Sequence, residues 1–218
     1  MAIIQKFRQQ FDLGGKFILD AIAPLRCLGC KRIGMIACAD CLAKVKIELK
    51  ATPGPEPIQT TVTVANFDEP LVQKLIHALK YDGIFSVSDI LAEWLISNLQ
   101  NFFVPDDELI PIPLHPTRQR ERGFNQSELM AKKLSREFNI PTNQNLKRIR
   151  NTKPQVECTG EERRTNLKEA FVYQSDINAK RIILLDDVTT TGSTFLEAAL
   201  AIRKFSQVPI IGITVARG

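Results

Sequence analysis

Two adjacent carboxylates, Asp186 and Asp187, follow directly on an unbroken aliphatic run, Ile182 to Leu185. Such a run predicts a buried strand, and in α/β sheets ligands bind at the carboxyl ends of the strands. The loop after the acids leads into an apolar pattern of helical spacing, so its backbone amides lie at a helix N-terminus, where they attract phosphate. Its small and hydroxyl-bearing residues are Thr190, Thr191, Gly192, Ser193 and Thr194. Carboxylates repel phosphate but accept hydrogen bonds from sugar hydroxyls, so the pattern indicates a ribose 5-phosphate ligand.

Two other phosphate-handling motifs do not fit this stretch. A Walker loop needs Gly-Lys followed by Ser or Thr, which the sequence lacks. A response-regulator receiver domain also ends a strand in paired acids, but it requires an Asp on a later strand. None of the 31 residues after Asp187 is Asp. An ordinary strand-to-helix turn with incidental aspartates stays open as the alternative without a ligand.

Four of the five cysteines form a second group with the spacing of metal ligands. They are Cys27, Cys30, Cys38 and Cys41. Each C-x2-C pair forms a tight turn whose thiolates point at one centre, and two such turns complete a tetrahedral zinc site. Disulfides are disfavoured in a chain without a signal peptide, whereas an iron–sulfur centre stays open. Because four thiolates leave no open position, we expect a structural role for the metal.

Positive charge is concentrated in one part of the chain. The net charge is +5, and the segment 118–169 holds thirteen Lys and Arg against seven Asp and Glu. A basic segment on an otherwise nearly neutral chain favours a polyanionic partner, either a phosphorylated small molecule or nucleic acid. The fifth cysteine, Cys158, stands alone in this segment, and we expect an ordinary surface thiol.

The remaining patterns predict how these groups are positioned. Strands are expected over 60–67, 108–115, 181–187 and 208–217, and helices over 68–83, 86–102, 125–140 and 195–205. Strands that alternate with helices predict an α/β domain around a mostly parallel sheet. We therefore divide the chain into an N-terminal helix with the cysteine unit (1–50), a proline-rich linker (51–58) and the main domain (59–218). The absence of a signal-peptide pattern and of a long apolar run predicts a cytoplasmic protein.

The stretch "ILLDDVTTTGST" closely resembles the phosphoribosyl-pyrophosphate (PRPP) motif of type I phosphoribosyltransferases. Further segments appear in the order typical of the ComF family of competence proteins. They are the four-cysteine unit, "LKYDG", "IPIPLHPTRQRERGFNQSELMAKKL", "KPQ" and "ERRTNLKEAF". The resemblance covers nearly the whole chain from Cys27 onward. It implies a type I phosphoribosyltransferase-like domain, a mostly parallel sheet flanked by helices, with a small N-terminal zinc-binding unit.

The resemblance also implies roles for individual residues. Asp186 and Asp187 would hold the ribose hydroxyls of PRPP with Mg²⁺ and would be the catalytic pair, with Thr190 to Thr194 on the 5-phosphate. The turn at Leu114 to Pro116 resembles the pyrophosphate loop, where His115 would contact phosphate, although related transferases often carry an acid or a small residue with glycine there. Residues 150 to 169 resemble a mobile lid that offers two arginines as clamps. These are Arg163 and Arg164.

Two functions follow from these expectations. One is a phosphoribosyltransferase that moves ribose 5-phosphate from PRPP to a nitrogen nucleophile. The other is a protein of natural transformation that handles single-stranded DNA and contacts proteins of the uptake machinery. A basic edge that meets DNA phosphates would be formed by Arg118, Arg120 and Arg122. We favour the second function, with PRPP binding retained, because the sequence offers no recognisable pocket for an acceptor base.

Overall fold

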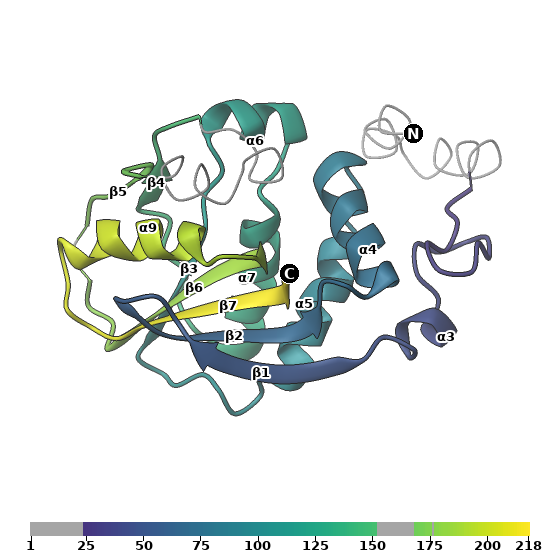
Figure 1. Cartoon of the computed structure of the whole chain (residues 1–218), viewed down its shortest axis with the longest axis horizontal. Helices are drawn as coiled ribbons and strands as arrows, with labels where there is room; N and C mark the ends of the chain where they lie inside the picture. The colour runs from purple at the N-terminus through teal and green to yellow at the C-terminus, as the bar shows by residue number, and fades with distance from the viewer. Residues whose placement is uncertain (1–23, 152–167, 176) are drawn as a thin grey trace.

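A computed structural model describes residues 24–151, 168–175 and 177–218 of the chain (Figure 1). Its centre is a five-stranded sheet in the order β1-β2-β7-β6-β3. The strands are β1 (Ile47–Pro53), β2 (Ile58–Asn66), β3 (Asp107–Pro111), β6 (Arg181–Thr189) and β7 (Ile210–Arg217). All neighbours pair in parallel except β1, which pairs antiparallel with β2 at one edge. The predicted α/β architecture with a mostly parallel sheet is confirmed.

Helices cover both faces of the sheet. Helices α4 (Pro70–Tyr81), α5 (Val87–Asn98) and α7 (Gln126–Phe138) pack on one face, and α9 (Ser193–Arg203) packs on the other. Successive residues of β6 point to opposite faces. Ile183 and Leu185 therefore join the core under α4, α5 and α7, whereas Ile182 and Leu184 join the core under α9. A strand covered on both faces must be apolar at every position, which explains the continuous aliphatic run.

Several short elements complete the fold. Helix α3 (Ala39–Leu42) lies in the cysteine unit, and α6 (Pro116–Arg122) follows the turn after β3. Strands β4 (Leu146–Arg148) and β5 (Phe171–Tyr173) form a separate antiparallel pair. None of these four elements was predicted from the sequence, because each is too short for a helical or alternating pattern to emerge.

The predicted linker 51–58 is partly wrong. Ala51 to Pro53 belong to β1 and pair with Thr60 to Val62 of β2, so only residues 54–57 connect the two strands. Proline is tolerated here because β1 is an edge strand and Pro53 is its last residue. The predicted N-terminal helix lies outside the described residues. The remaining division into domains stays a prediction.

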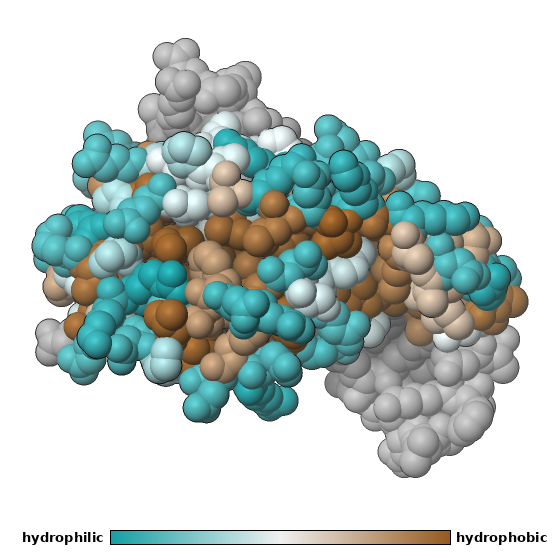
Figure 2. Space-filling view, turned by 90° about the horizontal axis from the view of Figure 1, so that it is seen from below, coloured by the Kyte–Doolittle hydropathy of each residue, from teal (hydrophilic) through white to brown (hydrophobic). Residues whose placement is uncertain are grey.

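The face on the β1 side of the molecule carries a band of hydrophobic residues between charged and polar ones (Figure 2). Leu49 of β1 is among the exposed large hydrophobic residues. No helix among the described residues combines the length and the apolar character needed to cross a membrane.

Candidate functional site

The two acids lie at the carboxyl-terminal part of β6, as predicted. Their carboxylates are held by backbone amides of the same strand: the amide of Asp187 donates to Asp186 Oδ1 and that of Val188 donates to Asp187 Oδ1, both at 2.9 Å. Asp187 is almost fully buried, whereas Asp186 is partly exposed. The two acids are therefore not equivalent, and Asp186 is the more accessible of the two.

Lys80, near the end of α4, forms an ion pair with the buried acid. Its Nζ lies 2.9 Å from Asp187 Oδ2. Burial alone would lower the pKa of Lys80, but the charges of Asp187 and Asp186 outweigh it, and the pKa of Lys80 is raised. The lysine therefore stays charged and offsets one of the two negative charges.

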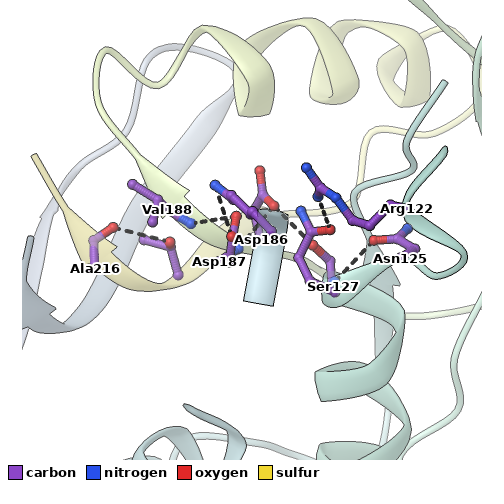
Figure 3. Close-up of polar contacts among 10 residues, drawn as sticks. Arg122, Asn125, Ser127, Asp186, Asp187, Val188 and Ala216 are labelled. Carbon is purple, nitrogen blue, oxygen red and sulfur yellow. Dashed lines mark hydrogen bonds and ion pairs between the residues drawn. The ribbon is translucent and has the colours of Figure 1, made fainter. Parts of the chain in front are cut away.

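The start of α7 supports the other acid (Figure 3). Ser127 Oγ donates to Asp186 Oδ1 at 2.9 Å. Ser127 is itself held by Asn125, the N-cap residue, whose side-chain oxygen accepts from the Ser127 amide at 3.0 Å. The side-chain amide of Asn125 also donates to the carbonyl of Ile112, just after β3, at 3.0 Å. The N-terminus of α7 thus fixes both Asp186 and the turn after β3.

The surroundings of Asp186 alter its acidity. Burial and the neighbouring charge of Asp187 raise the pKa of Asp186 to about 7, although Lys80 and the hydrogen bonds from the Asp187 amide and Ser127 act in the opposite direction. Asp186 therefore changes protonation near neutral pH. As a carboxylate it can accept hydrogen bonds from sugar hydroxyls or bind a hard cation such as Mg²⁺.

The loop after β6 leads directly into the N-terminus of α9. Gly192 caps α9 with φ 77°, a left-handed conformation that favours glycine. A side chain at this position would also meet Pro55, in the turn between β1 and β2. Thr191 and Ser193 share a hydrogen bond of 2.7 Å between their hydroxyls, and the buried Thr190 hydroxyl has no hydrogen-bond partner among the described residues. The loop thus combines hydroxyl donors with a helix N-terminus.

The turn after β3 leads into α6. His115 is the N-cap of α6, and its Nδ1 accepts a hydrogen bond from the Thr117 amide at 3.3 Å. Leu114 and His115 are both partly buried. The imidazole of His115 is therefore engaged in capping, and its predicted contact with pyrophosphate stays a prediction.

The three arginines do not form the single edge that the sequence analysis predicted. They lie on α6, so Arg118 and Arg122 share a face one turn apart while Arg120 points to the opposite side. Arg120 is exposed, whereas Arg122 is partly buried and donates to Gln126 Oε1 at 2.6 Å. Burial lowers the pKa of Arg122, and both acids act against that shift. The negative charges of Asp186 and Asp187 therefore act on the guanidinium group of Arg122. Arg163 and Arg164 of the predicted lid, like Cys158, lie outside the described residues.

The four cysteines lie together, as their spacing predicted. Their Sγ atoms all lie within 4.8 Å of one another, and Cys38 Sγ is 3.7 Å from Cys27 Sγ and 3.6 Å from Cys30 Sγ. Sulfurs bound at about 2.3 Å to one tetrahedral zinc ion would be about 3.8 Å apart, whereas a disulfide needs about 2.05 Å. The cluster therefore has the donor set and the spacing of a site for a metal ion such as zinc.

Comparison with known proteins places the chain among related sequences. It is 35% identical over 153 residues to competence protein F of Haemophilus influenzae, a match of 66% of either chain. It is 33% identical over 171 residues to the DNA utilization protein YhgH of Escherichia coli O157:H7, covering 75% of this chain and 70% of the relative. The chain belongs to the ComF family. Competence protein ComFC of Streptococcus pneumoniae is 30% identical over 115 residues, 53% of this chain and 49% of the relative. No family model matches the chain.

Three residues near the acid pair had no assigned role in the sequence analysis. Lys80 lies in "LKYDG" and Ser127 in "GFNQSE", two segments that carried the family resemblance without an assigned role. Arg148 of β4 is the third. Burial and the charge of Arg118 lower the pKa of Arg148 to about 10, whereas the charge of Asp186 acts in the opposite direction. The sequence segments that contain Lys80 and Ser127 indicated the family resemblance. No spacing or periodicity in the sequence indicated that Lys80 pairs with Asp187 or that Ser127 bonds to Asp186.

Proposed function

We propose that this ComF-family protein acts in DNA uptake, where it handles single-stranded DNA and binds PRPP with Mg²⁺ at the acid pair and the loop after β6. The observation that carries the proposal is the joint position of Asp186, Asp187 and the loop at one end of β6. Family membership supports it, since relatives are named competence and DNA utilization proteins.

The charges around the acid pair favour this ligand. Two free carboxylates would repel a triphosphorylated sugar, but Lys80 offsets the charge of Asp187 at 2.9 Å. Asp186 is then the one carboxylate that meets the ribose hydroxyls or Mg²⁺, and Ser127 holds it in place. The 5-phosphate would take the amides and hydroxyls of residues 190–194, at the N-terminus of α9.

The DNA would contact the basic residues of α6. Arg120 is exposed and Arg118 is partly exposed, both at the end of the sheet that holds the acids. Contacts between arginines and phosphates position a strand without reading its sequence. Binding of this kind falls steeply as salt concentration rises.

Calorimetric titration of the metal-loaded protein with PRPP and Mg²⁺, repeated with bound single-stranded DNA, tests both parts. The proposal expects saturable PRPP binding that Asp186→Asn weakens at least tenfold and the matched surface variant Asp89→Asn leaves unchanged. Asp186→Asn is the informative change because Asp187→Asn would also leave Lys80 buried without its partner. A change in PRPP affinity in the presence of DNA would couple the two sites. Failure of wild-type protein to bind PRPP refutes that part of the proposal.

The alternative is an active phosphoribosyltransferase. An acceptor nitrogen would attack the sugar carbon of PRPP as its bond to pyrophosphate breaks, so pyrophosphate would leave with the bonding electrons. The protein would contribute position and electrostatic stabilisation rather than a covalent step. Release of pyrophosphate from PRPP that depends on an added purine, pyrimidine or amine, and disappears in Asp186→Asn, would establish this activity. Absence of release with all acceptors would leave binding as the function.

We further propose a cytoplasmic location, with proteins of the DNA-uptake machinery as partners and the metal of the cysteine cluster in a structural role. Cell fractionation with detection of the chain tests the location. Cross-linking in transforming cells, with non-transforming cells as the control, tests the partners.

A further inference from the structure

A pocket of about 240 Å³ lies beside the turn that follows β3, outside the residues of the acid pair and of the loop after β6. One wall is formed by this turn and the start of α6, with Pro113, Leu114 and Pro116. Leu146 of β4 also lines the pocket. These prolines and leucines give the pocket a partly apolar lining, which suits the apolar faces of a planar ring.

Polar groups converge on the same pocket. The side chains of Gln119 and Gln144 line it and carry both hydrogen-bond donors and acceptors. Glu128 adds an acceptor and is anchored by Asn125, whose side-chain amide donates to it at 3.4 Å. Amides and a carboxylate beside an apolar lining match the alternating donors and acceptors on the edge of a nucleobase.

Positive charge borders the pocket on the β4 side. Arg148 lines it, with its guanidinium 5.5 Å from the centre of the Phe171 ring. Lys147, the neighbouring residue of β4, lines the pocket as well. Two cationic side chains that line one pocket favour an anionic ligand, and arginine binds phosphate in bidentate geometry.

We infer that this pocket binds one nucleotide, with its base against the proline and leucine side chains and its phosphate on Lys147 and Arg148. The nucleotide is either one unit of a DNA single strand or a free mononucleotide, because both present the same base and phosphate. The inference extends the proposed function, since it assigns base contacts to a protein whose other DNA contacts reach only the backbone. It does not require PRPP to bind.

Fluorescence anisotropy with a labelled oligodeoxynucleotide of about ten residues and with an abasic strand of equal length measures the contribution of the bases. We expect the strand with bases to bind at least tenfold more tightly than the abasic strand. The double variant Gln119→Leu/Gln144→Leu removes the amides from two exposed positions and is expected to reduce this ratio about tenfold, because the base loses hydrogen-bond partners in the pocket. Gln73→Leu/Gln100→Leu, at exposed positions elsewhere, is the matched control and should leave the ratio unchanged.

The outcomes separate this inference from the proposed function. Equal binding of both strands, or an unchanged ratio in the pocket variant, overturns the nucleotide pocket if deoxynucleoside monophosphates also fail to bind it, while DNA handling stands. Titration with deoxynucleoside monophosphates gives the second arm. If monophosphates bind and the pocket variant weakens them, but no strand binds, the pocket is a mononucleotide site and DNA handling fails. If neither strand nor monophosphate binds, both proposals fall.

Discussion

The ammonium group of Lys80 lies 2.9 Å from a carboxylate oxygen of Asp187, and the side chain of Asp187 is almost completely buried. The ion pair joins the end of α4 to the end of β6. It gives Asp187 a fixed charge partner, and it leaves Asp186 as the acid that we propose to meet the ligand.

Replacement of Lys80 by Met should strongly destabilise the protein. The buried carboxylate of Asp187 would lose its charge partner, and removal of one member of a buried pair typically costs about 3–5 kcal/mol. Unfolding by urea measures the loss. Lys133→Met is the matched control, because Lys133 pairs with Asp89 on the surface and such pairs contribute about 0–1 kcal/mol. Equal losses of unfolding free energy in the two variants would show that the buried Lys80–Asp187 pair stabilises the protein no more than a surface pair does.

Asp186 should make stability depend on pH around neutrality. Its pKa is raised from 3.8 to about 7 by burial and by the charge of Asp187, so the folded state binds more protons than the unfolded state between these values. Its contribution is therefore fully present below about pH 4 and is lost as pH rises through 7. Asp186→Asn mimics the neutral acid and should gain stability relative to wild type over this range, by at most about 1.4 kcal/mol per pH unit. Parallel stability curves from pH 4 to pH 8 would contradict the raised pKa.

Arg122 and Arg120 should differ in what they bind. Arg122→Gln is expected to weaken PRPP binding about tenfold, or ~1.4 kcal/mol, because its charge offsets that of the acid pair. Arg120→Gln should leave PRPP affinity unchanged and reduce the salt dependence of DNA binding, since its exposed side chain can meet phosphates. Calorimetry and anisotropy titrations over a range of salt concentrations measure the two effects. If both variants change PRPP affinity and the salt dependence of DNA binding in the same way, the arginines act as a single basic edge.

The cysteine cluster should bind about one zinc ion per chain. Cys38→Ser removes a buried ligand and should reduce bound zinc to below about a tenth of an ion. Gly29→Ala should also weaken binding, because a side chain at this position would lie 2.6 Å from Cys41 Sγ. Cys158→Ser is the control that should keep full occupancy. Metal analysis of the purified proteins measures the zinc content of each variant. Iron in place of zinc would show that the cysteine cluster is an iron site.

The sequence by itself determined the features that depend on neighbours in the chain. The aliphatic run, the two acids and the threonine-rich loop are contiguous, so their order alone predicted a strand end followed by a helix N-terminus. The two C-x2-C pairs likewise predicted a cluster of four sulfurs, because short turns fix their geometry. Secondary structure and such motifs follow from local periodicity and turn chemistry, which a single sequence records.

Only the tertiary structure decided which distant side chains meet. Lys80 pairs with Asp187 and Ser127 bonds to Asp186 because α4 and α7 pack on the same face of the sheet, and nothing in the spacing of these residues encodes that packing. The arginines of α6 show the same limit. Their alternation suggested one edge, but the backbone forms a helix after Pro116, and a helical turn sends Arg120 away from Arg118 and Arg122. Side-chain contacts between elements depend on how the cores pack, and the periodicity of a sequence gives only the face that each element buries.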